Sequence, residues 1–226
     1  MQFVCRIKGL TWCYMNDIFA SLRQGAPAVP TKKRDEMRRI IMDATMKLIN
    51  ERDVCDIKPS DIMKITGLSR AAFYYHFPDI PSILLELYQR DAMPMGNTIT
   101  DTNNNAAQVI TNVVNYFIKF GRLERAILLY AGRHRTIYDF MNARISWRIN
   151  QIATIIKRDQ AAGLARPDLD PIEAAAMSHF AVSGYLTWHF GRSDNPISPE
   201  KAIRHIMLTV VHDIYPNISA SPSQPA

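Results

Sequence analysis

The stretch KPSDIMKITGLSRAAFYYHF, residues 58–77, decides the fold of this chain. Its first part has apolar residues at the spacing of a short amphipathic helix, and Gly67 is a residue type that commonly ends a helix. Ser69 follows two residues later and is suited to cap the N-terminus of a second helix. The apolar positions of the first helix are Ile62, Met63 and Ile65. The stretch therefore predicts two short helices joined by a turn.

The second helix of this stretch combines an aromatic anchor with a surface of small and polar residues. Phe73 and Phe77 are four residues apart, so both fall on one face and can hold the helix against a core. The other positions carry small or hydrogen-bonding side chains: Arg70, Ala71, Ala72, Tyr74, Tyr75 and His76. Two short helices joined by a Gly-containing turn form a helix-turn-helix, whose second helix fits the major groove of DNA. The pattern thus predicts DNA binding.

Each side chain of the second helix has a chemistry that suits DNA. The Arg70 guanidinium can form bidentate hydrogen bonds with guanine or a phosphate, and a tyrosine hydroxyl can donate a hydrogen bond to a phosphate. Of the adjacent Tyr74 and Tyr75, we expect one to pack inward and Tyr74 to contact DNA. For His76 a packing or capping role competes with a phosphate contact, and Ser69 is first a helix cap. The predicted DNA-binding residues are Lys32, Lys33, Arg34, Lys58, Ser69, Arg70, Ala71, Ala72, Tyr74, Tyr75 and His76.

Helical periodicity continues on both sides of the motif. Apolar residues at helical spacing predict a helix over about residues 32–52, and Pro59 suits the first turn of the helix that follows. A further helix is predicted to begin near Asp79. Pro94 and Gly96 are expected to end or kink it.

After the polar segment TDTNNN, the chain has the pattern of helices only. One apolar face is expected to stop at Gly121, and a short helix follows over residues 126–131. A long helix is predicted to reach Gly163, another covers residues 172–190, and the last covers residues 203–214. No alternating pattern is long enough to support a strand. The predicted fold class is therefore all-α.

The composition is that of an ordinary globular protein with a basic excess. The chain is 47% apolar and carries a net charge of +6, which suits a polyanionic partner. The basic excess is distributed evenly along the chain. Residues 1–94 hold 14 Lys and Arg against 11 Asp and Glu, and residues 95–226 hold 13 Lys and Arg against 10 Asp and Glu. No apolar run approaches the roughly 20 residues that cross a bilayer, so no membrane partner is expected. Cys5, Cys13 and Cys55 form no disulfide framework, which favours a cytoplasmic setting.

The helix-turn-helix and the aromatic residues that close it resemble the TetR (tetracycline repressor) family of transcription regulators. The family pattern ends the recognition helix with small-small-aromatic-Tyr-x-x-Phe, and residues 71–77 are AAFYYHF. The phrases GLARPDLDPIEAA at residues 163–175 and SPEKAIRHIM at residues 198–207 resemble the C-terminal half of the family. The resemblance covers about residues 31–215.

The chain departs from the family pattern at two positions. Lys58 stands where the family commonly has a capping Thr, and Ile80 stands where it often has a phosphate-binding Lys. We expect a weaker hold on the DNA backbone, or one shared with the basic run that begins at Lys32.

The resemblance implies an all-helical subunit that dimerises through its last two long helices and binds a small molecule in its C-terminal domain. The implied domains are an N-terminal extension (1–30), a three-helix helix-turn-helix DNA-binding domain (31–78), a connecting helix (79–97), a helical ligand-binding and dimerisation domain (98–216) and a flexible tail (217–226). The implied partners are double-stranded operator DNA, a largely apolar effector and a second copy of the chain. The candidate dimer residues are Met177, Ala181, Gly184, Trp188, Ile203, Met207 and Val210.

The candidate ligand-binding residues are aromatic or polarisable side chains in the C-terminal half. They are Tyr116, Met141, Trp147, His179, Phe180 and Tyr185, for which plain core packing is the competing interpretation. Six arginines within residues 122–148 could form a basic pocket for an anion, although a solvated helix face is the more ordinary interpretation of each. They are Arg122, Arg125, Arg133, Arg135, Arg144 and Arg148.

The sequence favours a ligand-responsive regulator, with repression as the expected sign, over two other classes. The chain has no Gly-rich phosphate loop, no H-E-x-x-H and no metal-spaced cysteine pair, so no sequence pattern indicates an enzyme. No catalytic residue, cofactor or metal is therefore expected. A DNA-architectural protein without an effector is the remaining alternative, but it would not need the large apolar C-terminal half.

Overall fold

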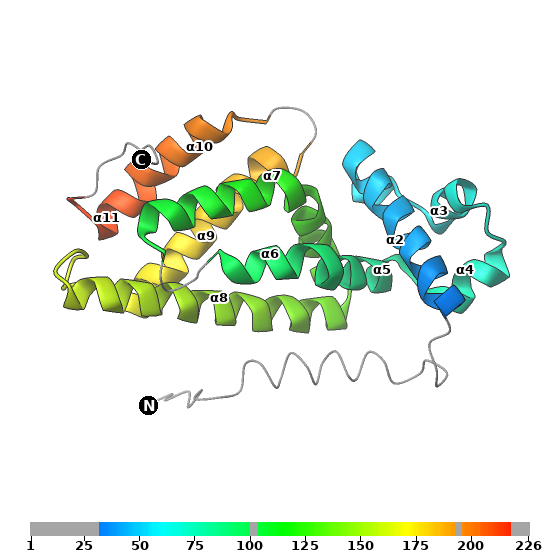
Figure 1. Ribbon diagram of the computed structural model, residues 1–226, viewed down its shortest axis with the longest axis horizontal. Helices are drawn as coiled ribbons and strands as arrows, with labels where there is room; N and C mark the ends of the chain where they lie inside the picture. Colours follow the sequence, from blue (N-terminus) through cyan, green and yellow to red (C-terminus); the bar gives the residue numbers. More distant parts are fainter. Residues whose placement is uncertain (1–31, 100–103, 193–195, 218–226) are drawn as a thin grey trace.

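The computed structural model describes residues 32–99, 104–192 and 196–217, and every regular element among them is helical. Figure 1 shows a small group of helices at one end of the molecule and a larger bundle at the other, joined by a connecting helix. The predicted all-α class is confirmed. The predicted extension over residues 1–30 lies outside the described residues, as does almost all of the predicted tail.

The small unit is built from three helices and one short 3₁₀ turn. They are α2 (Lys32–Glu51), η1 (Val54–Asp56), α3 (Pro59–Thr66) and α4 (Arg70–His76). Ile41, Ile62 and Phe73 are fully buried where the three helices meet, and Phe77 closes the same core. The predicted helix boundaries in this unit agree with the structure to within one or two residues.

The connecting helix runs through Pro94 instead of ending near it. It comprises α5 (Ile80–Leu87), the π-helical turn η2 (Tyr88–Ala92) and α6 (Met93–Thr98). In the π turn the Met93 N–H bonds to the carbonyl of Tyr88, five residues back. This wider turn directly precedes Pro94, which has no N–H to give, so the chain continues in helical form.

The large unit is a bundle around three long helices, α7 (Ala106–Ala131), α8 (Arg135–Ala161) and α9 (Pro171–Phe190). The C-terminal segment crosses this bundle as α10 (Pro199–Ile206), a second π turn η3 (Met207–Val211) and α11 (His212–Ile214). The prediction that a helix stops at Gly121 is wrong, because α7 continues through it as one helix. Gly121 is instead a close-packing site: a Cβ there would lie 2.8 Å from the backbone carbonyl carbon of Phe190.

Arginine side chains tie the two units together. Arg122 donates to the carbonyls of Asn50 (2.5 Å) and Ile49 (3.3 Å) at the end of α2. Arg125, one turn further along α7, forms an ion pair with Asp53 in the loop that follows α2. The end of α2 and the start of the helix-turn-helix are thereby fixed to the long helix of the bundle.

Candidate nucleic-acid interface and internal pocket

The turn between α3 and α4 has the geometry that its residues predict. Gly67 adopts a left-handed conformation with φ of +69°, and open space surrounds the position of a Cβ, so the backbone conformation is what requires glycine here. The Ser69 hydroxyl accepts a hydrogen bond from the Ala72 N–H at 3.2 Å and caps α4. Asp61 accepts from the Lys58 N–H at 2.9 Å and holds the start of α3. The predicted helix-turn-helix is confirmed as a local structure.

Helix α4 is anchored by its phenylalanines and leaves its other face open. Phe73 and Phe77 are fully buried, while Arg70 and Ala71 are exposed. The prediction that one tyrosine packs inward is wrong: Tyr74 is 41% exposed and Tyr75 is 63% exposed. The two phenylalanines already occupy the inward face of this two-turn helix, so neither tyrosine has a place in the core. Ala72 and His76 are partly buried at the edge of this face.

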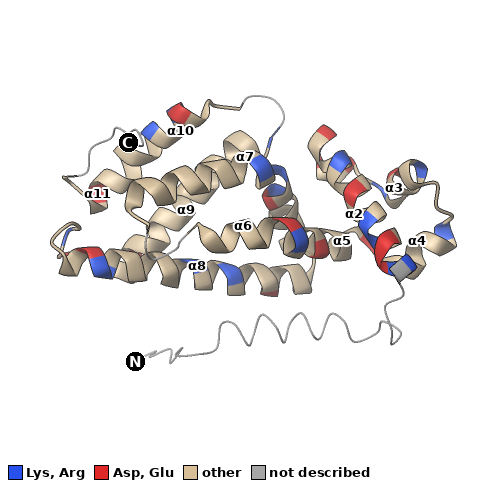
Figure 2. Ribbon diagram, viewed as in Figure 1, with Lys and Arg blue, Asp and Glu red and all other residues tan. Residues whose placement is uncertain are grey.

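Basic side chains accompany both tyrosines. The Arg70 guanidinium lies over the Tyr74 ring at 5.7 Å, and that of Arg34 on α2 lies over the Tyr75 ring at 5.9 Å. Lys33 and Lys58 are exposed, and Lys32 begins α2 with a side chain outside the described set. Figure 2 shows Lys and Arg on α2, α3 and α4, with acidic residues between those on α2. The surface thus offers cations and hydroxyl donors next to each other.

The surroundings of His76 favour a neutral imidazole with a structural role. Burial, together with the charges of Arg38 and Arg34, lowers the pKa of its imidazole below the ordinary value, so the ring is neutral at physiological pH. Its Nδ1 is buried without a hydrogen-bond partner in the described part of the chain. Arg38, which sequence reasoning missed, donates to the His76 carbonyl and to Glu86 and so braces α4 between α2 and α5.

A cavity of about 450 Å³ lies in the large unit, between α7, α8, α9 and the C-terminal helices, and it reaches the surface at the exposed Phe180 and Trp188 of α9. Four predicted ligand-binding residues line it: Tyr116, Met141, His179 and Phe180. The two others do not. Trp147 borders a separate small crevice beside Gly96, and the Tyr185 hydroxyl instead forms a hydrogen bond with His205 Nδ1 at 3.0 Å.

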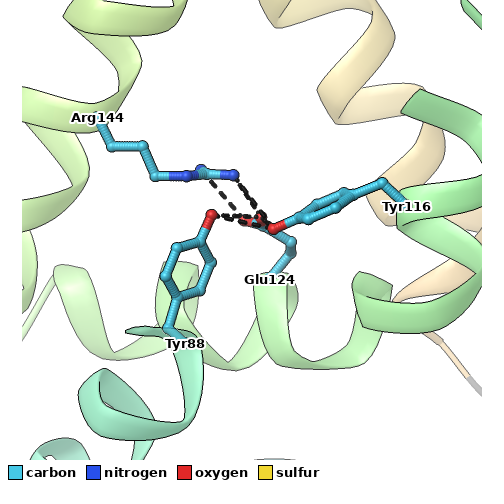
Figure 3. A network of polar contacts seen from close by, with 4 residues as sticks. All are labelled: Tyr88, Tyr116, Glu124 and Arg144. Atoms are coloured by element: carbon cyan, nitrogen blue, oxygen red, sulfur yellow. Dashed lines mark hydrogen bonds and ion pairs between the residues drawn. The ribbon is translucent and has the colours of Figure 1, made fainter. Parts of the chain in front are cut away.

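A buried polar network forms part of the wall of this cavity. Tyr116 is a predicted ligand-binding residue and Arg144 was named only among the basic residues, whereas Tyr88 and Glu124 were missed. Figure 3 shows Tyr88, Tyr116, Glu124 and Arg144 pointing toward one another from three helices. The Tyr88 hydroxyl lies 3.0 Å from that of Tyr116 and 3.1 Å from Glu124 Oε1, which Arg144 Nη2 approaches to 2.6 Å. Tyr116 also donates to Glu124. Burial raises the pKa of both phenols, so both hydroxyls remain protonated donors.

Arg148 lies one helical turn beyond Arg144 and lines the same cavity. Its side chain is buried, and burial, reinforced by the charge of Arg144, lowers the pKa of the guanidinium. His179 on α9 has a neutral ring: burial lowers its pKa to about 4, and Arg144 and Arg148 act in the same direction. The interpretation of Arg144 and Arg148 as a solvated face is therefore wrong, whereas Arg133 and Arg135 are exposed as that interpretation requires.

The network could have been found from the spacing of its residues. Tyr116, Phe120 and Glu124 follow one another at four-residue intervals, which places a carboxylate on the apolar stripe of α7. Arg144 and Arg148 likewise interrupt the stripe of α8 that Met141 continues. An acid and two arginines on facing apolar stripes indicate buried charge.

Helix α9 carries a row of exposed apolar or small residues on one face. Met177 is 72% exposed and Trp188 is 63% exposed, and Ala181 and Gly184 between them are exposed as well. Nothing lies within 4 Å of a Cβ built on Gly184. These four predicted dimer residues are thus exposed on the subunit surface, and Gly184 and Trp188 also line the cavity.

The other predicted dimer residues lie on the C-terminal helices and differ in exposure. Met207 is 3% exposed and belongs to the core of the subunit, so its prediction as an interface residue is wrong. The π turn directs Met207 inward and leaves Leu208 exposed instead. Ile203 is partly buried, and Val210 lines the cavity.

No cluster of three or more His, Cys, Asp or Glu that could hold a metal ion occurs among the described residues. Within the same residues, no helix is long and apolar enough to cross a membrane.

Comparison with solved structures identifies the fold. A protein from Saccharomonospora viridis whose crystal structure holds choline matches with a TM-score of 0.64 and 23% identity, over 80% of this chain and 98% of that one. A TetR transcription regulator from Haloarcula marismortui matches with a TM-score of 0.62 and 13% identity, over 80% and 99% of the two chains. SmeT, the repressor of the Stenotrophomonas maltophilia efflux pump SmeDEF, matches with a TM-score of 0.60 and 18% identity, over 83% and 97%.

No protein-family model and no curated protein matches the chain. At the identities of the solved structures the likeness establishes the fold. The chain has the fold of the TetR-family transcriptional regulators, as the residue pattern of α3 and α4 predicts.

Proposed function

We propose that this protein is a transcription regulator that binds operator DNA as a dimer and is released by a small molecule in its C-terminal domain. The observation that carries the proposal is the open face of α4. Arg70, Tyr74 and Tyr75 are exposed on a helix that two buried phenylalanines and a serine cap hold in position. A rigid helix with exposed donors is suited to enter a major groove.

The dimer is supported by the exposed apolar row on α9. Isolated exposed apolar residues are ordinary, but a continuous row on one helix is a common sign of an interface. A two-fold axis at this row would give the molecule two copies of α4. Binding of both copies to one face of DNA requires half-sites about 34–36 Å apart, which corresponds to a near-palindromic operator.

Ligand response is supported by the position of Arg125. This residue lines the cavity, and its guanidinium pairs with Asp53 at the start of the helix-turn-helix unit. A ligand that displaces Arg125 would move the unit that carries α4. The ligand must bind the DNA-binding and the released arrangements unequally, because an equal affinity would shift no population. Repression is the sign we propose, as in SmeT.

The cavity also weighs against an architectural DNA-binding protein without an effector. Such a protein has no need for a cavity of about 450 Å³ with charged residues in its wall. The same helices could otherwise pack against one another, as protein interiors usually do.

The test compares two arginine–tyrosine pairs with equal guanidinium-to-ring distances. Arg70 and Tyr74 on α4 are 5.7 Å apart from guanidinium to ring, and so are Arg135 and Tyr138 on α8, where both are exposed. Arg70→Ala/Tyr74→Ala should weaken binding to duplex DNA from beside the gene at least tenfold, since each base contact contributes about 1–3 kcal/mol.

Fluorescence anisotropy at two salt concentrations, with random DNA as competitor, measures this effect. Arg135→Ala/Tyr138→Ala removes the same groups and the same charge, and it should bind DNA as the wild type does. An α4 variant that keeps wild-type affinity would rule out α4 as the reading helix.

A further inference from the structure

We propose that the cavity binds a carboxylate with an extended apolar body, and that Arg148 receives the carboxylate. The inference rests on the proposed function only in taking this cavity as the effector site. It concerns the chemistry of the ligand, and three observations of the cavity wall support it.

The first observation is the isolation of Arg148. In the described part of the chain its guanidinium makes no hydrogen bond and no ion pair; its one ring contact is with Trp147, at 5.5 Å. The side chain is 6% exposed and borders both the cavity and the small crevice beside Gly96, where one terminal nitrogen would lie 3.3 Å from a Cβ built on Gly96. A buried guanidinium without a partner is costly, and a carboxylate that accepts two of its N–H groups would remove that cost.

The second observation is the charge balance of the wall around Arg148. Arg144 is matched by Glu124 at 2.6 Å, and the hydroxyl of Tyr116 donates to the same carboxylate. Glu124 is the one acidic residue among the described residues that line the cavity, and the His179 ring is neutral.

Arg125 and Arg192 also line the cavity, and Arg125 is paired with Asp53 outside it. Around Arg148 itself, two arginines and one carboxylate leave a net charge of +1. A single carboxylate neutralises it, whereas a phosphate monoester would bring more negative charge.

The third observation is the apolar character of the rest of the cavity. From Arg148 the lining continues with Val113, Phe117, Ile152, Ile156 and Val182. A cavity of about 450 Å³ lies in the range of small-molecule sites. The apolar lining excludes a ligand that is polar throughout, and the unpaired arginine disfavours a cationic one. The combination selects an amphipathic anion.

Calorimetry on the full-length protein without DNA tests this inference directly. The probes are two carboxylates of different shape, decanoate and 2-naphthoate, their neutral counterparts decan-1-ol and 2-naphthalenemethanol, and decyltrimethylammonium as a cation. At least one carboxylate should bind tenfold or more tightly than its neutral counterpart and than the cation. Arg148→Met keeps the length of the side chain and should weaken carboxylate binding by about ten- to a hundredfold. It should leave binding of the alcohol unchanged or stronger.

The matched control is Arg135→Met, which removes an exposed arginine from the same helix. Because Arg148→Met could alter packing, the comparison of probes on wild-type protein stands on its own. Equal affinity for carboxylate and alcohol, tighter binding of the cation, or no saturable binding of either carboxylate would overturn the inference.

DNA binding is measured separately. A protein that binds its operator but no carboxylate refutes this inference alone, and one that binds decanoate but no DNA refutes the proposed regulator alone.

Discussion

At the scale of single residues, His179 reports the electrostatics of the cavity. Its ring is partly buried in the cavity wall; burial, together with the charges of Arg144 and Arg148, lowers its pKa from 6.5 to about 4. Between these two values the unfolded chain binds a proton that the folded chain does not. The free energy of unfolding should therefore fall as the pH decreases from about 6.5 to about 4, by at most about 1.4 kcal/mol per pH unit from this group. Above pH 6.5 the group makes no pH-dependent contribution.

Replacing His179 with Gln should remove the contribution of this residue to the pH dependence of the unfolding free energy. We expect the unfolding free energy of His179→Gln, measured by urea titration from pH 4 to 8, to fall less steeply below pH 6.5 than that of the wild type. His212→Gln replaces an exposed histidine and serves as the control, with the wild-type slope. Equal slopes for all three proteins would mean that folding does not lower the pKa of His179.

The residues of the DNA-facing helix could be predicted from sequence, whereas those of the cavity could be predicted only in part. Ser69, Gly67 and Phe73 act locally, through capping, backbone conformation and a four-residue spacing, so the sequence carries the whole argument. Arg144 and Arg148 depend on which helix covers them. Their place on an apolar stripe of α8 is visible in the sequence, but the helices that cover this stripe, α7 and α9, are known only from the packing.

At the scale of helices, the contact between α7 and the end of α9 depends on Gly121. The backbone carbonyl carbon of Phe190 would lie 2.8 Å from a Cβ at this position, and backbone cannot move aside as a flexible side chain can. Gly121→Ala should therefore destabilise the protein by about 1–3 kcal/mol, the usual cost of overpacking. Urea unfolding measures this change.

Gly132→Ala is the matched control for this substitution. Gly132 follows the same helix in a right-handed conformation with φ of −68°, and nothing lies within 4 Å of an added Cβ. Alanine there should be neutral or stabilising by up to about 1 kcal/mol. A Gly121→Ala protein that is as stable as the wild type would show that α7 and α9 pack less closely than described.

The same glycine explains why helix boundaries in the large unit were harder to predict than those in the small one. A glycine inside an apolar pattern indicates either a helix end or a close approach, and the two are distinguished only by the partner helix. Pro94 is a similar case, because the preceding π turn accommodates it. The small unit has caps at nearly every boundary, so its local signals agree with its structure.

At the scale of the whole molecule, two copies of α4 require a dimer, and the exposed row on α9 is the candidate seam. Met177→Glu places a charge on the most exposed apolar residue of that row, so the dimer should dissociate while the subunit stays folded. Sedimentation velocity should give a monomer, and far-UV circular dichroism should give the wild-type helix content.

Tyr138→Glu is the control for the dimer, since it places the same charge on an exposed residue of α8. This variant should sediment as the wild type does. If Met177→Glu remains dimeric, the exposed row on α9 is not the dimer interface.

In the function proposed above, a dimer presents two copies of α4 to DNA. The most direct measurement is selection of binding sites by the full-length protein from a pool of random duplexes, followed by sequencing. We predict one enriched inverted repeat whose half-sites are centred about 10–10.5 base pairs, or a multiple of that, apart. The absence of any enriched sequence, or an enriched sequence without two-fold symmetry, would contradict it.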